Sequence, residues 1–247
     1  MTTTSTDVPL HEIEADAIVV AIGGSELSGP AKKLNEHTEG ALQRMIDDKE
    51  VSLKTGVTTS WLTPPGLRTA LVMLVGTGKT DSTTESDYFK AAGAASLKLA
   101  SKKRNQVAFY FPDLPSNQLE AAITGSLVGC HGQDICRDKQ NLHPHENILW
   151  STTDGTTLQS ACIIASGINL ARDLVNGPPN MIYPESFAEQ ISQLHGESGL
   201  QVEIWDGARL AQENCGSLLA VAQGSAREAR LAIIRYQGSE CENPQLA

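Results

Sequence analysis

Three stretches of this sequence combine residue types that could bind a ligand or a metal ion. The first, Val75 to Thr80, follows an apolar run and ends in the Gly-Lys-Thr of a phosphate-binding loop. Such a loop also needs a glycine five residues before Gly78, so that successive backbone N–H groups can surround the phosphates. Met73 occupies that position. We therefore expect a glycine-rich turn after a strand here, and no nucleotide site.

The second stretch is Gly23-Gly24-Ser25, directly after the apolar run from Asp16 to Ile22. Open α/β sheets commonly bind ligands at the carboxyl ends of their strands, which is where these glycines would lie. The GxGxxG spacing of a dinucleotide-binding turn is missing. A tight turn is the simpler interpretation, and a ligand cleft is the alternative.

The third stretch holds the main concentration of metal-ligand residue types in the sequence: Cys130, His131, Cys136, His143 and His145. Zinc sites typically use closely spaced pairs of ligands that fix a tetrahedral geometry. Here the two cysteines lie six residues apart, and two of the histidines flank a proline in a polar segment. This spacing favours an exposed loop without a metal ion.

Several common catalytic patterns are missing from the chain. It has no HExxH pair for a helical zinc site, no GxSxG nucleophile turn and no CxxC redox pair. Isolated acids such as Asp173 and Asp206 are expected to cap helices or to lie on the surface. The residues alone therefore predict no catalytic, cofactor-binding or metal-binding residue in this chain.

Length, charge and composition are those of an α/β protein. A chain of 247 residues can bury roughly three quarters of its unfolded surface without disulfide staples. The net charge of -10 and the pI near 5.0 argue against nucleic acid as a partner, because phosphate binding needs clustered Lys and Arg. Five scattered cysteines favour reduced thiols. Without a signal peptide or a membrane-spanning run, the sequence predicts a soluble, cytoplasmic protein.

Apolar periodicity predicts alternating strands and helices, in which the strands would form a sheet and the helices would cover its faces. Expected strands cover 16–22, 57–62, 70–75, 106–111 and 147–150, the last as a short edge strand. Expected helices cover 29–45, 88–100, 119–128 and 158–175, and Phe89, Leu97 and Leu99 are core candidates of the second. Together these elements indicate a first α/β domain.

A joint follows at Ala171 to Asn180, ARDLVNGPPN. A helix should end near Val175, with Asn176-Gly177 as a left-handed end, and a new helix should begin at Pro184. Its apolar face would comprise residues 187, 188, 191 and 194, and Gly196 or Gly199 would end it. Beyond it we expect strands at 201–205, 217–222 and 231–236 and a short helix at 207–213. They would form an unfinished second sheet, parallel or mixed.

The joint carries a pattern that resembles the leucyl aminopeptidase family of two-metal peptidases. The resemblance rests on ARDLVN at 171–176, PPN at 178–180, Pro184-Glu185 and Ala188, then GSLLAVAQGS at 216–225, Arg230-Leu231 and 236–238. Two long motifs in the right order and spacing make it specific. The first 150 residues match more loosely, through DAIVVAI and LVGTGK. In place of a common capping threonine stands Tyr183, so the helix that starts at Pro184 should lack a side-chain N-cap.

The resemblance implies a macro-domain-like N-terminal α/β domain over 1–157, a linking helix and joint over 158–177, and the first part of an aminopeptidase-type catalytic domain over 178–247. Full-length relatives would remove N-terminal residues from peptides with two zinc or manganese ions, in the cytoplasm and as hexamers. Their metal ligands and catalytic residues lie beyond the stretch that matches. We therefore expect a truncated chain that holds no metal and is inactive alone.

Two other interpretations remain open at this point. The N-terminal domain could bind an ADP-ribose-type ligand through the Gly23-Gly24 cleft, or could serve only in assembly. An accessory role in DNA binding, which the resemblance also allows, is disfavoured by the net charge.

Overall fold

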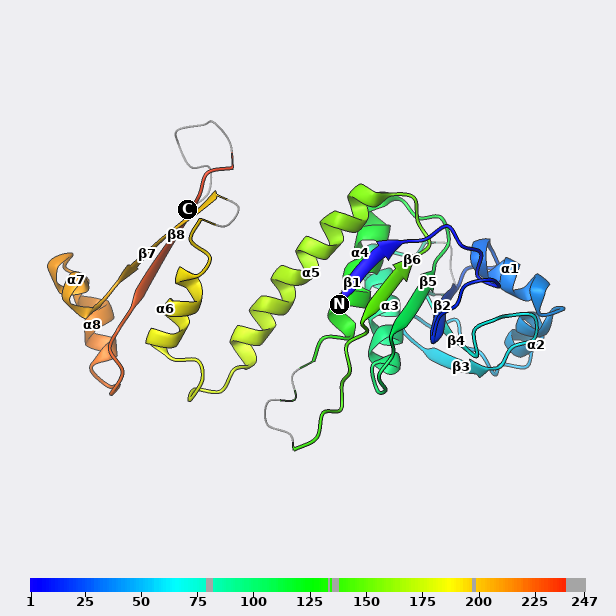
Figure 1. The fold of residues 1–247 in the computed structure, drawn as a ribbon, viewed down its shortest axis with the longest axis horizontal. Helices are drawn as coiled ribbons and strands as arrows, with labels where there is room; N and C mark the ends of the chain where they lie inside the picture. Colours follow the sequence, from blue (N-terminus) through cyan, green and yellow to red (C-terminus); the bar gives the residue numbers. More distant parts are fainter. Residues whose placement is uncertain (79–81, 133, 135–137, 197–198, 239–247) are drawn as a thin grey trace. The chain divides into compact units, whose positions relative to one another are not determined.

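The fold was analysed in a computed structural model that describes all residues except 79–81, 133, 135–137, 197–198 and 239–247. The chain forms two compact units, Met1–Asp173 and Leu174–Ala247. Each unit is an α/β structure (Figure 1), as the sequence predicts. Among the described residues, no helix is long and apolar enough to cross a membrane.

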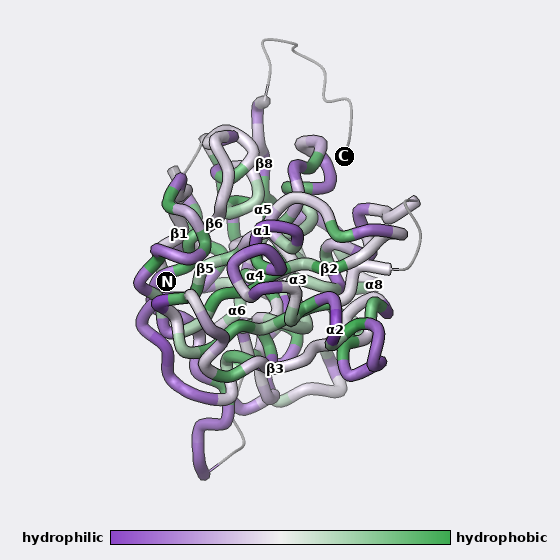
Figure 2. The backbone as a smooth tube through the Cα atoms, turned by 90° about the vertical axis from the view of Figure 1, so that its right-hand side faces the viewer, coloured by the Kyte–Doolittle hydropathy of each residue, from purple (hydrophilic) through white to green (hydrophobic). Residues whose placement is uncertain are grey.

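The first unit is built on a six-stranded sheet in the order β1-β6-β5-β2-β4-β3. Its strands are β1 (Thr2–Ser5), β2 (Ala17–Ile22), β3 (Thr58–Leu62), β4 (Leu71–Gly76), β5 (Gln106–Tyr110) and β6 (Asn147–Trp150). All neighbours pair in parallel except β3, which runs antiparallel to β4. Every residue of β2 is buried, as its continuous apolar run predicts for a strand covered on both faces. Figure 2 colours the backbone by the hydropathy of each residue.

Helices cover both faces of this sheet. Helices α1 (Gly29–His37) and α2 (Ala41–Asp47) pack on the face formed by Ile18, Val20 and Ile22. Helices α3 (Glu85–Leu99), α4 (Ser116–Gly129) and the first part of α5 (Gly155–Asn176) pack on the face of Ala17, Val19 and Ala21. Alternate residues of β2 therefore serve two separate cores, because successive side chains of a strand point to opposite faces.

Four expectations for the first unit were wrong in detail. The helix predicted over 29–45 is two helices, because Glu39 and Gly40 both take positive φ angles, 52° and 78°. Strand β1 was not predicted, since its polar sequence TTTS has no apolar alternation. It pairs with β6, so β6 is an interior strand and not the edge. Leu97, a core candidate, is 50% exposed.

The second unit contains α6 (Pro184–Ser192), β7 (Leu200–Trp205), α7 (Gly207–Gln212), α8 (Gly216–Ala222) and β8 (Leu231–Tyr236). Strands β7 and β8 pair antiparallel, so the parallel arrangement is wrong for this pair. The segment predicted as a strand over 217–222 is helix α8. Its apolar run SLLAVA fits a short helix as well as a strand, which is the usual ambiguity of a run of this length.

The joint between α5 and α6 has the expected bounds but a different ending. Helix α5 ends at Asn176 and α6 begins at Pro184. Neither Asn176 nor Gly177 has a positive φ angle, so the predicted left-handed end is wrong. Tyr183 makes no side-chain cap, as predicted, but its backbone N–H donates to Ser186 Oγ at 3.0 Å. This reverse bond satisfies a backbone donor at the start of α6.

Candidate functional site

The turns after β2 and β4 are tied to each other at the carboxyl edge of the sheet. The backbone N–H of Gly24 donates to the carbonyl of Gly78 at 3.0 Å, and that of Thr77 donates to the carbonyl of Ile22 at 2.9 Å. A Cβ atom placed on Gly23 would lie 2.1 Å from Thr77 Oγ1. A side chain at Gly23 therefore has no room, and the expectation of tight glycine turns at this edge is confirmed.

A cavity of about 220 Å³ lies beside these turns. Gly23, Gly24 and Ser28 line it from the loop that follows β2, and Pro112 and Asp113 line it from the loop that follows β5. The first loop leads to α1 on one face of the sheet, and the second leads to α4 on the other face. Adjacent parallel strands whose loops leave in opposite directions open a crevice between them, which is the usual ligand position in open α/β sheets.

A second cavity, of about 510 Å³, continues along the same edge and also contains Pro112, Asp113 and Leu114. Its walls include the segments that follow β1 and β6, at Thr6–Asp7 and Ser151–Asp154. We call the two cavities together the carboxyl-edge groove. The groove follows the ends of five parallel strands and is the candidate ligand site of the first unit.

The charged side chains on the groove wall are Asp7, Lys33, Asp113 and Asp154. Asp154 already has hydrogen-bond partners within the chain. Its carboxylate accepts from the N–H of Thr157 at 2.9 Å and from the Thr157 hydroxyl at 2.6 Å. These bonds lower the pKa of Asp154. The groove thus carries more negative than positive charge.

The residues of the segment 129–145 do not come together as a metal site. Among the described residues, no group of three or more His, Cys, Asp or Glu could hold a metal ion. His131 Nε2 lies 2.8 Å from Asp173 Oδ1, so both residues form a surface pair. Cys136 lies outside the described residues.

The ends of that segment are buried, which corrects the expectation of an exposed loop. Cys130 is fully buried and His145 is 1% exposed. Burial raises the pKa of the Cys130 thiol and lowers the pKa of His145 to about 4. Among the described residues, neither ring nitrogen of His145 has a partner in hydrogen-bonding geometry. Both residues therefore belong to the interior and not to a reactive site.

The stretch resembling a phosphate-binding loop is described only at its start. Thr77 is 5% exposed, and its hydroxyl donates to the carbonyl of Ile22 at 3.3 Å. Lys79 and Thr80 lie outside the described residues.

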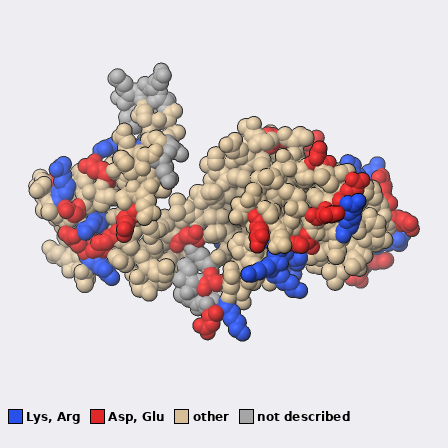
Figure 3. All heavy atoms as spheres, viewed as in Figure 1, with Lys and Arg blue, Asp and Glu red and all other residues tan. Residues whose placement is uncertain are grey.

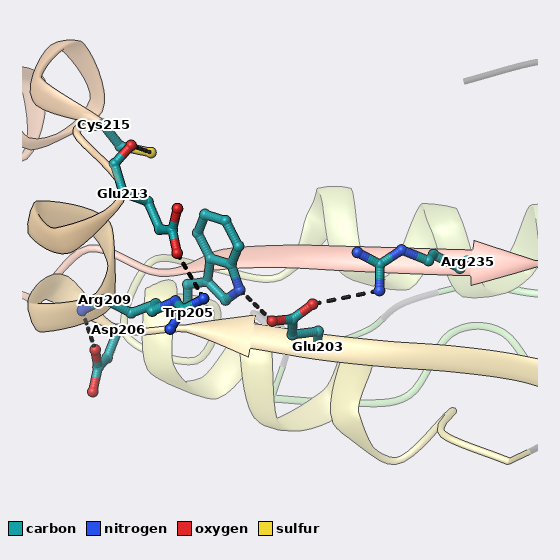
Figure 4. A network of polar contacts seen from close by, with 7 residues as sticks. All are labelled: Glu203, Trp205, Asp206, Arg209, Glu213, Cys215 and Arg235. Atoms are coloured by element: carbon teal, nitrogen blue, oxygen red, sulfur yellow. Dashed lines mark hydrogen bonds and ion pairs between the residues drawn. The ribbon is translucent and has the colours of Figure 1, made fainter.

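In the second unit, polar side chains form a network at the end of β7 (Figure 4). Glu203 accepts from Trp205 Nε1 at 2.7 Å and pairs with Arg235 at 3.4 Å, and the first of these contacts contributes most to lowering the pKa of Glu203. Asp206 accepts from the N–H of Arg209 at 2.8 Å. Asp206 is thus the N-cap of α7, as expected for an isolated acid, and the network fixes the turn into that helix.

The structure singles out three groove residues that sequence reasoning missed: Asp7, Lys33 and Asp113. Asp7 and Asp113 each lie two or three residues beyond the end of a parallel strand, and Lys33 lies in the second turn of α1. The signal for Asp113 was the strand end at Pro112, which marks the carboxyl edge. No comparable signal existed for Asp7, because the polar strand before it was not recognised.

Two family models match the chain in sequence order. The description "Cytosol aminopeptidase family, N-terminal domain" matches residues 18–140, and "Cytosol aminopeptidase family, catalytic domain" matches residues 169–247. A "Probable cytosol aminopeptidase" of Rhizobium etli is 31% identical over 252 residues, which cover 96% of this chain and 48% of that protein. One of the same description from Rhodopirellula baltica is 27% identical over 99% of this chain and 50% of its own length.

Solved structures show the same fold. A tomato leucine aminopeptidase mutant matches with a TM-score of 0.78 at 19% identity, over 95% of this chain and 50% of that one. The bottromycin maturation enzyme BotP in complex with Mn matches with a TM-score of 0.73 at 23% identity, over 91% of this chain and 46% of that one. These matches define an α/β chain that combines the N-terminal domain of a peptidase family with a segment of its catalytic domain.

The chain belongs to the cytosol aminopeptidase family, which confirms the resemblance read from the sequence motifs. It spans about half the length of the curated relatives it matches.

Proposed function

We propose that residues 1–247 form the N-terminal domain and the first catalytic-domain segment of a metallo-aminopeptidase, a hydrolase that removes N-terminal residues from peptides. The observation that carries this proposal is the pair of family matches, which follow one another over both structural units. We also propose that the N-terminal domain covers 1–157, the linking helix and joint 158–177, and the first part of the catalytic domain 178–247.

The catalytic metal centre does not fit the residues described here. Two-metal hydrolysis uses ions about 3.5–4 Å apart to polarise the substrate and to activate water. The described part of the chain offers no group of three or more ligands for even one ion. We therefore propose that the chain is inactive by itself. For the complete protein we propose two zinc or manganese ions, and a structural neighbour in complex with Mn supports a divalent ion.

Assembly and location are parts of the same proposal. We propose a homo-hexamer for the complete protein and a cytoplasmic location, the latter supported by relatives described as cytosol aminopeptidases. The charge of the chain disfavours nucleic acid as a partner. Figure 3 shows one face, on which Lys and Arg lie in small groups among Asp and Glu, and the net charge is -10.

Two measurements test the proposal. Purified 1–247 should give no chelator-sensitive hydrolysis of leucine amide with either Mn²⁺ or Zn²⁺, and real metal-dependent turnover would refute its inactivity. The second measurement uses a chimera that joins 1–247 to the second half of the Rhizobium etli relative. This chimera should show metal-dependent hydrolysis of leucine amide. A chimera that folds cooperatively but stays inactive would contradict the assignment as an aminopeptidase domain pair.

A second candidate function is a binding module, because the carboxyl-edge groove lies where α/β sheets bind ligands. An ADP-ribose-type ligand would place a diphosphate beside Asp7, Asp113 and Asp154, with Lys33 as the groove's counter-charge. Like charges disfavour this ligand. Calorimetry with ADP-ribose tests the binding-module function. An absence of heat at high micromolar concentration would refute binding of an ADP-ribose-type ligand.

A further inference from the structure

The carboxyl-edge groove contains acidic and basic side chains, and three of them are uncommitted among the described residues. Among the described residues, no hydrogen bond or ion pair engages the side chains of Asp7, Lys33 or Asp113. All three are exposed, and all three line the larger cavity. A group that enters the groove can therefore meet two carboxylates and one ammonium that are not committed elsewhere.

One part of the wall of the larger cavity is apolar. Phe111 is 5% exposed and Leu119 is 7% exposed, and Pro112 and Leu114 lie between them on the loop into α4. The volume of about 510 Å³ falls in the roughly 300–1,000 Å³ range of small-molecule pockets. The groove can thus bury an aliphatic side chain while the charged groups stay at its rim.

The neighbouring small cavity adds polar groups. Ser28 is the N-cap residue of α1, but its hydroxyl makes no capping bond. The Gly23-Gly24 turn lines this cavity, and a Cβ atom at Gly23 would meet the side chain of Thr77, which lines it as well.

We propose that the carboxyl-edge groove binds a free α-amino acid with an apolar side chain. The ammonium group of the ligand lies against Asp113 and Asp7, its carboxylate pairs with Lys33, and its side chain packs on Phe111 and Leu119. A zwitterion satisfies both signs of charge, whereas a phosphate would meet two uncompensated carboxylates and a simple cation would leave Lys33 unpaired. The proposal is independent of catalysis, because none of these residues belongs to a metal centre.

The test is calorimetry of the full chain with leucine as the probe. Because the charges are exposed, we expect saturable binding with a Kd on the order of 1 mM. Leucinol, which lacks the carboxylate, and 4-methylpentanoate, which lacks the ammonium group, should each bind about fivefold more weakly. ADP-ribose should give no heat under the same conditions. Absence of leucine binding, or binding of ADP-ribose in its place, would overturn the proposal.

Variants locate the binding site. Lys33→Gln and Asp113→Asn should each weaken leucine binding about fivefold. Lys32→Gln and Asp47→Asn serve as controls, because they remove the same charges from α1 and α2 outside the groove. All four positions are exposed, so unfolding midpoints should stay close to that of the parent. Leucine binding that is equal in all five proteins would place the ligand elsewhere and refute the assignment. The chimera's turnover is measured separately, so the two proposals can fail independently.

Discussion

Acid should destabilise the first unit through His145. The side chain is 1% exposed, and burial lowers its pKa from 6.5 to about 4, with a smaller contribution from Arg104 and a partial offset from the backbone of Ser96. A histidine whose pKa is depressed by folding binds its proton more readily in the unfolded chain. Stability is therefore unaffected by this group above pH 6.5 and is lost as the pH falls from 6.5 toward 4.

The magnitude follows from the size of that depression. At 1.36 kcal/mol per pKa unit, the contribution of His145 amounts to about 2 kcal/mol at pH 5 and about 3 kcal/mol at pH 4. Carboxylates also titrate in this range, so the effect of His145 must be taken as a difference between two proteins. His145→Leu removes the titrating ring and the two unpartnered nitrogens, and it should be neutral or stabilising at pH 7.

The assay is urea unfolding followed by tryptophan fluorescence between pH 7 and pH 4. In a Trp205→Phe background, both remaining tryptophans, Trp61 and Trp150, report on the first unit. The parent should lose about 2 kcal/mol more than His145→Leu between pH 7 and pH 5. His37→Leu is the control, because it removes one exposed imidazole and leaves His145 intact. Parallel pH profiles for the parent and His145→Leu would refute the reasoning.

Three further substitutions test helix packing and capping. Gly125→Ala would place a Cβ 2.2 Å from the carbonyl of Phe89 at the contact of α3 and α4, and we expect a loss of about 1–3 kcal/mol in urea unfolding. Gly167→Ala, in α5 with nothing within 4 Å, should instead stabilise by roughly 0.5–1 kcal/mol, and equal effects at both sites would contradict the packing argument. Asp206→Ala should cost about 1 kcal/mol of the second unit's stability through loss of the bond to the Arg209 N–H. The readout is a lower midpoint of Trp205 fluorescence in a background in which Trp61 and Trp150 are replaced by Phe. An unchanged midpoint would show that the cap contributes nothing.

Local sequence patterns predicted most elements because burial imposes a regular spacing on apolar residues. The run AIVVAI is rich in β-branched residues and so favoured a strand covered on both faces, and Pro184 suited the first turn of a helix. The errors occurred where this constraint is weak. Strand β1 is polar and exists through its pairing with β6, and the SLLAVA run of α8 is too short for its period to distinguish helix from strand.

The candidate groove was predicted only in part. The Gly23-Gly24 turn pointed to the carboxyl edge from the sequence alone. Asp7, Lys33 and Asp113 are separated by 26 and 80 residues in the chain, and no motif connects them. The parallel order of the strands brings them to one cavity, because loops that follow parallel strands all emerge at the same edge.

By itself, the sequence determined the family, the α/β class and the place of the joint, because these depend on residue type and local spacing. Only the tertiary structure decided that His145 is buried, that β6 is interior, and that three distant charged residues face one groove. These properties depend on which segments pack together, and burial and charge proximity acquire their energetic meaning only when the chain has folded.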